Sequence, residues 1–155
     1  MIDSFNGEHR FLSNFYLCEV EYQGVKYPSA EHAFQAAKCW DVLKRDQFLV
    51  GSPGQAKRLG RRVRLRSDWE QVKYRIMAEV VLAKFMQNPE LKEKLFATEG
   101  EELIEGNTWN DTYWGVCRGR CENKLGGILM RIRDWLLFGI HEDWVENVFT
   151  GEEQY

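Results

Sequence analysis

The chain has 155 residues, a length that favours one domain, because a domain of this size buries about 70% of the surface that its unfolded chain exposes. Its 44% hydrophobic and 29% charged residues exclude a low-complexity, collagen-like or predominantly disordered chain. The formal net charge of −3 argues against a dedicated nucleic-acid binder. Six Trp, six Tyr and nine Phe exceed what a core of this size needs, so some rings are available to stack on a ligand.

The N-terminal third predicts a hairpin and a helix. Residues 18–22 and 25–27 are rich in β-forming side chains and flank Gln23-Gly24, which predicts a β-hairpin. Small and apolar residues then recur at helical spacing behind Ser29, a residue suited to an N-cap. This pattern predicts a helix of about three turns that ends at Trp40.

Four further helices are predicted after this one. A Ser cap, a Pro and a Gln at 52–55 form a capping-box pattern that starts a helix into a basic segment. The same pattern at Ser67 opens the longest helix, which ends near Asn88. A short helix follows from Pro89 to Phe96, and a last one places an apolar stripe between 125 and about 139.

The predicted fold is therefore α+β and predominantly helical. Residues 102–105 resemble a short strand, which with the N-terminal hairpin would make a small sheet. No repeat or linker divides the chain, so we expect a single compact domain over 1–155. Its core would span about 5–139, followed by an acidic C-terminal tail at 140–155.

We also expect a cytoplasmic protein without a membrane partner. The N-terminus is charged rather than apolar, and the longest apolar run, at 135–140, has six residues, whereas a spanning helix needs about 20. The four cysteines are scattered along a chain long enough to fold without disulfides, so we interpret them as reduced thiols.

The first candidate for chemistry is Glu31, in the first turn of the helix after the hairpin. Glu31, Gln35 and Lys38 recur at positions i, i+4 and i+7, which places them on one polar stripe of that helix. A simpler interpretation is also open, because a Glu in the first turn stabilises a helix through its dipole by about 0.3–1 kcal/mol.

The second candidate is Asp111, in a polar and aromatic loop at 106–115. An Asp held against aromatic rings loses hydration, and its charge then acts strongly on a nearby cation. The alternative is an Asx-turn with packed rings.

The third candidate is the segment 57–66, which has six basic residues in ten. Such a run is commonly a solvated face, but in an acidic protein it also suits a phosphate. Trp69 follows in the first turn of the longest helix, where it can stack on a base beside exposed backbone N–H groups or pack in the core.

No metal or cofactor is expected. Cys117 and Cys121 have no second pair of Cys or His at zinc-site spacing, and the three His are spread along the chain. Gly126-Gly127 lies in an apolar helix and suits close packing rather than a nucleotide loop, because the phosphate-binding fingerprint is missing.

Six co-linear segments between about 5 and 137 resemble the YbiA-like, or NADAR, family. The segments are 11–16 (FLSNFY), 27–38 (YPSAEHAFQAAK), 52–53 with 59–61 (SP and LGR), 68–73 (DWEQVK), 110–115 (NDTYWG) and 122–131 (ENKLGGILMR). The resemblance implies a compact, mainly helical α+β domain with N-glycosidase activity. Its substrates would be riboflavin-pathway ribosylamino-pyrimidine intermediates or ADP-ribose attached to guanine.

The family's functional residues fall on matching positions of this chain. Its functional Glu falls on Glu31, its Trp on Trp69 and the Asp of its D-x-x-W-G motif on Asp111, while Asn14 matches its S-N-F element. Between 115 and 123 the chain departs from the family, because it lacks a glycine-rich run and carries two extra Arg and two Cys. This departure bears on the substrate rather than on the chemistry.

The resemblance also implies roles. Cleavage of an N-glycosidic bond develops positive charge on the ribose, which a carboxylate stabilises. We expect Glu31 to activate water or stabilise this charge and Asp111 to position the ribose or assist the leaving group, although the two roles can be exchanged. Trp69 would stack on the base and Trp114 would wall the site. The residues expected to bind the phosphate are Lys38, Lys57 and Arg61.

Two other functions remain open at this stage. The same aromatic and basic residues would suit a non-catalytic module that binds ADP-ribose or a related nucleotide. Residues 57–66 would also suit a nucleic-acid contact, and this alternative merges with the enzyme if the modified guanine lies in a nucleic-acid strand. The expected partner is a small phosphorylated ribosyl compound or ADP-ribosylated guanine in nucleic acid, and the oligomeric state is left open.

Overall fold

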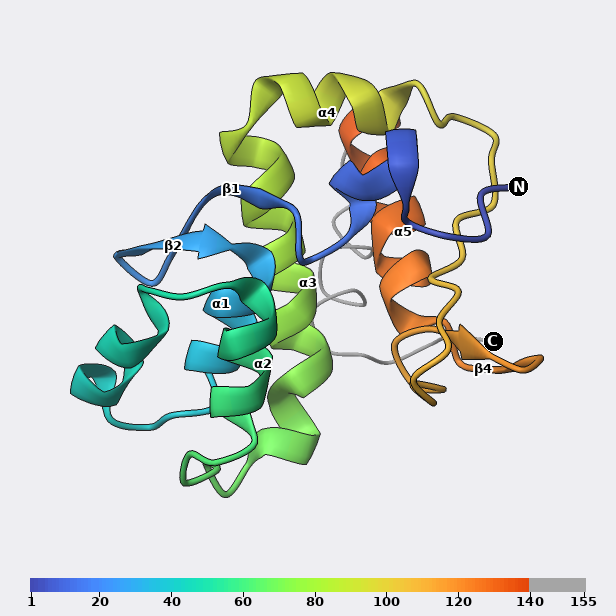
Figure 1. The fold of residues 1–155 in the computed structure, drawn as a ribbon. Helices are drawn as coiled ribbons and strands as arrows, with labels where there is room; N and C mark the ends of the chain where they lie inside the picture. The colour runs from blue at the N-terminus through green and yellow to red at the C-terminus, as the bar shows by residue number, and fades with distance from the viewer. Residues whose placement is uncertain (140–155) are drawn as a thin grey trace. The chain divides into compact units, whose positions relative to one another are not determined.

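The computed structural model describes residues 1–139, so the predicted acidic tail at 140–155 lies outside the described residues. The described chain is mostly helical with short antiparallel strand pairs, which confirms the predicted α+β class (Figure 1). It divides into two compact units. The Glu31 unit is Asn14–Pro89, and the Asp111 unit is Met1–Ser13 together with the chain from Glu90. The expected single domain over 1–155 stays a prediction.

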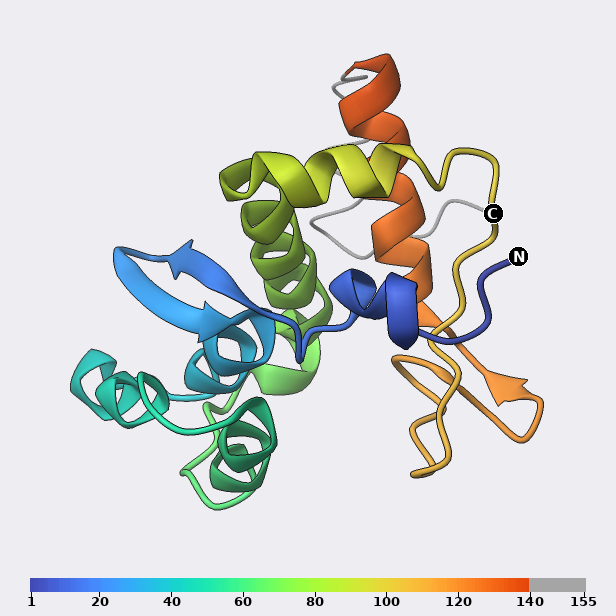
Figure 2. The same ribbon diagram turned by 45° about the horizontal axis from the view of Figure 1, so that its top comes forward.

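The Glu31 unit begins with the predicted hairpin. Strands β1 (Leu17–Tyr22) and β2 (Val25–Ser29) pair antiparallel, with Tyr22 opposite Val25. Gln23 and Gly24 both have positive φ, at 49° and 80°, which is the backbone that a tight two-residue hairpin turn requires. Helix α3 (Trp69–Gln87) packs beside β1, and the Tyr22 hydroxyl donates to Glu79 on that helix at 2.6 Å (Figures 1 and 2).

Helix α1 (Ala30–Ala36) is buried along its whole length of seven residues. Ser29 caps it as predicted, because its Oγ accepts from the His32 N–H at 3.2 Å. The helix ends at Ala36, so the predicted end at Trp40 is wrong. Carbonyls past its end bond elsewhere: that of Lys38 accepts from the Arg66 N–H at 2.9 Å, and that of Cys39 from Arg45 Nε at 3.1 Å.

Helices α2 (Pro53–Gly60) and α3 pack against α1 (Figure 1). The capping box at the start of α2 forms as predicted. The predicted Ser67 cap of α3 is wrong, because Asp68 occupies the N-cap position. Asp68 makes no cap bond with its side chain, since the Arg66 guanidinium binds its carboxylate at 2.7 and 3.0 Å. A short 3-10 helix, η2 (Val42–Phe48), was not predicted.

The Asp111 unit contains the two remaining predicted helices, α4 (Pro89–Phe96) and α5 (Lys124–Phe138). It also contains a 3-10 helix, η1 (Gly7–Leu12), and a second strand pair of β3 (Val116–Cys117) and β4 (Arg120–Cys121). The apolar faces of these elements make its core, in which η1 lies beside α5 (Figures 1 and 2). None of the helices within residues 1–139 combines the length and the apolar composition that crossing a bilayer requires.

Residues 102–105 do not form the predicted strand, and the hairpin is a two-stranded sheet by itself. The segment's hydrogen bonds are divided among several partners, so only an isolated bridge between Leu103 and Ile2 results. The Asn123 side chain takes part, because it accepts from the Glu105 N–H and donates to the Leu103 carbonyl. A Cβ at Gly126 would collide with that same carbonyl, which confirms the close packing predicted for Gly126-Gly127 at its first residue, whereas a Cβ at Gly127 would meet no atom within 4 Å, so the prediction is wrong there.

Lys84 is a buried cation in the middle of the Glu31 unit. Its side chain on α3 is only 1% exposed, and Nζ lies 5.8 Å from the Tyr16 ring centroid and 5.2 Å from that of Phe85. Burial lowers the pKa of Lys84 to about 8, and a negative charge on Cys18 opposes this shift. The unfolded chain therefore holds a proton between about pH 8 and pH 10.5 that the folded chain releases.

We predict that Lys84→Met stabilises the fold at pH 7 by about 2–3 kcal/mol, because it removes the cost of burying a charged amine. This cost is fully present below pH 8 and disappears as pH rises to 10.5. The difference in unfolding free energy between the variant and the wild type, measured by urea denaturation, should therefore shrink with rising pH. Lys26→Met, at a side chain 65% exposed, is the control. A difference for Lys84→Met that does not change with pH would contradict the prediction.

Candidate active site

Glu31 is a buried acid at the start of α1. Its side chain is 6% exposed, and Oε1 accepts a hydrogen bond from Gln35 Nε2 at 2.8 Å, one turn along the helix. Burial of a carboxylate costs free energy unless donors compensate it, and the amide of Gln35 together with the helix N-terminus provides this compensation. The carboxylate is therefore fixed in one orientation.

Asn14 lies beside Glu31, and its expected role in substrate binding stays a prediction. Its backbone carbonyl accepts from the Glu31 N–H at 3.0 Å. Its buried side chain contacts Met77 on α3, with 3.3 Å between Nδ2 and Sδ. Asn14 thus ties the first segment of the unit to the first turn of α1 and to α3.

The three predicted phosphate ligands form a cationic cluster near Glu31. Lys38 follows α1, while Lys57 and Arg61 lie one turn apart on α2 and its C-cap. Burial lowers the pKa of Lys38, and the charges of Arg61 and Lys57 lower it further, whereas the Glu31 carboxylate raises it. Glu31, Lys57 and Arg61 thus all act electrostatically on Lys38, and cations gathered in this way suit a bound phosphate.

Trp69 is buried at the first position of α3, with 6% of its surface exposed. Its ring lies 5.1 Å from that of Phe34, tilted by 52°, and Lys38 Nζ lies 5.7 Å from its centroid. Trp69 therefore packs against α1 and interacts with a cation of the cluster. Stacking of its ring on a base stays a prediction.

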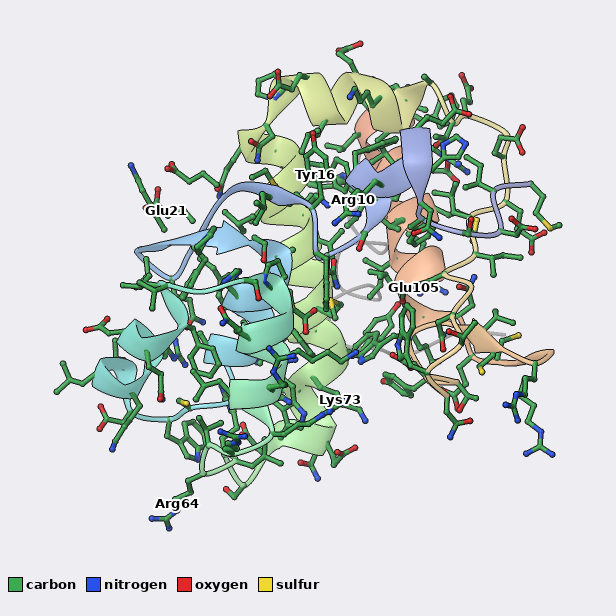
Figure 3. The ribbon with its side chains drawn as sticks, in the orientation of Figure 1. Arg10, Tyr16, Glu21, Arg64, Lys73 and Glu105 are labelled. Atoms are coloured by element: carbon green, nitrogen blue, oxygen red, sulfur yellow. The ribbon has the colours of Figure 1, made fainter. Side chains whose placement is uncertain are left out.

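The rest of the basic segment faces away from this cluster or has other partners. Arg62 and Arg64 are exposed, and Figure 3 shows Arg64 pointing outward from the stretch between α2 and α3. Arg66 binds Asp68 and lies 4.2 Å from the ring centroid of Trp40. Both interpretations of the segment 57–66, a phosphate site and a solvated face, therefore apply to different residues. Lys57 and Arg61 belong to the cationic cluster, whereas Arg62 and Arg64 are exposed to solvent.

In the Asp111 unit, Asp111 organises the polar and aromatic loop. Its Oδ1 accepts from the N–H groups of Tyr113 at 3.2 Å and Trp114 at 2.9 Å, which is the Asx-type turn considered above. The Asn107 side chain bonds to both the N–H and the carbonyl of Asp111. Trp114 is half-buried and meets the edge of Tyr113 with 4.6 Å between ring centroids. Because Asp111 and Glu31 belong to different units, their meeting at one sugar stays a prediction.

Two buried polar residues of α1 were not among the predicted site residues. His32 is fully buried, with Nδ1 2.6 Å from Ser29 Oγ and Nε2 2.9 Å from the Gly51 carbonyl. Burial lowers the pKa of His32, so it serves as a neutral link between α1 and the approach to α2. Gln35, which holds Glu31, was signalled only by its i+4 spacing from that acid.

The described residues also bear on metal binding and on the cysteines. Within residues 1–139 no group of three or more His, Cys, Asp and Glu side chains is placed to hold a metal ion. All four cysteines are free, and Cys117 and Cys121 lie on the paired strands β3 and β4.

Comparison with known proteins places the chain in a family. The model of the NADAR domain matches residues 3–137. The N-glycosidase YbiA of Escherichia coli (strain K12) is 40% identical over 129 residues, which cover 81% of this chain and 80% of that protein. A riboflavin biosynthesis protein of Vibrio vulnificus is 39% identical over 132 residues, 83% of this chain but 36% of that protein.

A solved structure agrees with these sequence matches. The NMR structure of Escherichia coli YbiA superimposes with a TM-score of 0.76 at 36% identity, covering 92% of each chain. The chain therefore belongs to the NADAR family of YbiA-like N-glycosidases, and it is an enzyme of this class. The predicted family and enzyme class are confirmed.

We predict that Asp111→Ala lowers the unfolding free energy by about 1–2 kcal/mol, because two backbone N–H groups lose their acceptor. Asp111→Asn keeps an acceptor oxygen and should lose less than half of that amount. Thermal and urea denaturation of both variants measure the difference. Equal destabilisation by Ala and Asn would show that the negative charge, rather than the hydrogen bonds, holds the loop.

Proposed function

We propose that this chain hydrolyses the N-glycosidic bond between a base or amine nitrogen and a phosphorylated ribose. One observation carries the proposal: the buried Glu31 carboxylate, bound by Gln35, interacts electrostatically with Lys38, on which Lys57 and Arg61 also act. Neighbouring helices of one unit thus provide both the acid that acts at the anomeric carbon and the cations that bind the phosphate in this proposal. The similarity to N-glycosidases favours hydrolysis over the non-catalytic binding module.

In the proposed reaction the bond between C1′ and the leaving nitrogen breaks, and a bond between C1′ and a water oxygen forms. One proton of the water goes to a carboxylate, and the leaving nitrogen takes up a proton. Glu31 activates the water or stabilises the positive charge on the ribose, while Asp111 positions the ribose or assists the leaving group, or the two exchange these roles. Carboxylates suit both roles because the transition state is cationic.

The remaining predicted residues bind the substrate in this proposal. Lys38, Lys57 and Arg61 hold the phosphate, Trp69 stacks on the base and Trp114 walls the site. Asn14 supports Glu31 through its backbone carbonyl. Positively charged side chains give phosphate recognition by charge-assisted hydrogen bonds.

Two substrate classes fit this arrangement, namely ribosylamino-pyrimidine phosphates of the riboflavin pathway and ADP-ribose attached to guanine, free or in a nucleic-acid strand. The resemblance to a riboflavin biosynthesis protein of Vibrio vulnificus favours testing the first class first. We propose the cytoplasm as the compartment, since free thiols such as the four found here persist in a reducing environment.

We predict that Glu31→Gln lowers turnover by about 10²–10⁴-fold, because the amide cannot accept a proton or carry the charge. The fold should persist, since an amide oxygen at this position still accepts from Gln35. The measurement is chromatography of the free base released from a ribosylamino-pyrimidine phosphate and from ADP-ribosylated guanosine.

Glu90→Gln is the matched control, because Glu90 is also the second residue of a helix but is exposed. It should keep wild-type turnover. Near-normal release of base by Glu31→Gln would remove Glu31 from the mechanism. Release from neither substrate by the wild type, with tight binding of one of them by calorimetry, would favour the non-catalytic module.

We predict that affinity for ribose 5-phosphate decreases at a lower pH than an ordinary lysine would give, because burial lowers the pKa of Lys38. The ammonium binds phosphate below this pKa, and binding weakens as pH rises through it. Lys38→Arg should retain the affinity to higher pH, and Lys38→Met should lose about tenfold at pH 7. Calorimetric titrations from pH 7 to pH 10 measure these effects, and identical profiles for all three proteins would exclude Lys38 from the phosphate site.

A further inference from the structure

Gln35 donates a hydrogen bond to the proposed catalytic carboxylate, but only one end of its own side-chain amide has a hydrogen-bond partner. Its side chain is 5% exposed, and Nε2 donates to Glu31 Oε1 at 2.8 Å. The other end of the same amide, Oε1, is buried with no hydrogen-bond partner. Buried carbonyl oxygens in native proteins nearly always have a partner, so this one needs an explanation.

The packing of α2 fixes the position of this amide. A Cβ at Gly60 would overlap Oε1 of Gln35 and would lie 2.7 Å from its Cδ, so only glycine fits beside it. Gly60 is the last residue of α2 and is not among the described residues with positive φ, so space rather than backbone conformation favours glycine here. A larger residue at this position would have to displace the Gln35 amide.

The orientation of the amide follows from Glu31. If the amide turned over, its oxygen would face the Glu31 carboxylate and its NH₂ group would face Gly60. The amide oxygen and the carboxylate oxygen, which are both acceptors, would then repel each other. The donor must point to Glu31, and the carbonyl is consequently left against Gly60 without a donor. A methionine would fill the same space without an unpaired oxygen, but it would also take the donor away from the Glu31 carboxylate, so the amide is explained by its bond to that acid.

We propose that Gln35 is a positioning residue of the N-glycosidase reaction, which orients the Glu31 carboxylate and is itself held by Gly60. This inference rests on the proposed function, because it takes Glu31 as the reacting acid. The structure retains a locally unfavourable amide where its one hydrogen bond is to that acid. Gln35 acts through Glu31 and need not touch the substrate.

The first test is Gln35→Met, assayed for base release and for thermal stability. The variant should lower kcat by about ten- to a hundredfold and change KM by less than threefold, because the carboxylate loses its orientation but the phosphate cluster is intact. Its melting temperature should stay within a few degrees of the wild type, because the loss of the unpaired carbonyl offsets part of the loss of the donor to Glu31. A structural role alone predicts an unchanged kcat.

The second test displaces Gln35 without removing it. Gly60→Ala should lower kcat as Gln35→Met does, whereas Gly127→Ala, where an added Cβ meets no atom within 4 Å, should keep wild-type kcat. In a Gln35→Ala background, Gly60→Ala should cost no further kcat, because no amide remains to be displaced. Additive losses in this double variant would show that Gly60 acts independently of Gln35 and would overturn the coupling.

Glu31→Gln, measured in the same assay, separates the two proposals. If Glu31→Gln abolishes turnover and Gln35→Met leaves kcat within twofold of wild type, the positioning role is wrong and the proposed function stands. If Glu31→Gln also keeps its turnover, Glu31 is not the reacting acid and the proposed mechanism itself fails.

Discussion

The Glu31 unit depends on the burial of polar groups along a helix that the rest of the unit encloses. A carboxylate, an imidazole and an amide on α1 are all removed from water, and each such group is destabilising unless it finds a partner. Glu31 has Gln35, and His32 has both Ser29 and the Gly51 carbonyl. These bonds fix the rotation of α1, so the orientation of the acid is set by the core rather than by solvent-exposed contacts.

Close packing of α1 makes this arrangement possible. Its alanines are almost fully buried, and their small side chains allow α2 and α3 to approach the helix backbone. The approach of α2 brings Lys57 and Arg61 toward Lys38, whose pKa is lowered first by burial and then by repulsion from these two cations. An arrangement that gathers like charges around one buried acid stabilises neither helix, but it complements an anionic substrate.

Local signals predicted most of the fold because each has a local physical cause. The positive φ angles at Gln23-Gly24 and the capping box of α2 act within four residues, and both were recognised. The end of α1 was wrong because the carbonyls of Gln35 and Ala36 accept from N–H groups three residues on, and beyond them Arg66 and Arg45 take the carbonyls of Lys38 and Cys39. The strand predicted at 102–105 was wrong for the same kind of reason, since its backbone groups pair with Ile2 and a side chain instead of a neighbouring strand.

The residues of the candidate site likewise divide into those that a local sequence pattern indicated and those that depend on distant contacts. The i, i+4 and i+7 stripe indicated Glu31 and Lys38 without a structure, and it contained Gln35 without showing what its amide does. The contact of Asn14 with Glu31 joins residues 17 positions apart, and that of Gln35 with Gly60 joins residues 25 apart, so no sequence period contains either of them. Such contacts depend on tertiary packing, which is why they were not predicted.

Two locally unfavourable groups meet at one point of this unit, a buried acid at Glu31 and an unpaired carbonyl on Gln35, and Gly60, the last residue of α2, lies beside them. Both groups oppose folding. Each is explained by the next, since Gly60 makes room for Gln35 and Gln35 holds Glu31. Selection for stability alone would remove both unfavourable groups, so their coincidence around one carboxylate supports the proposal that Glu31 is the reacting acid.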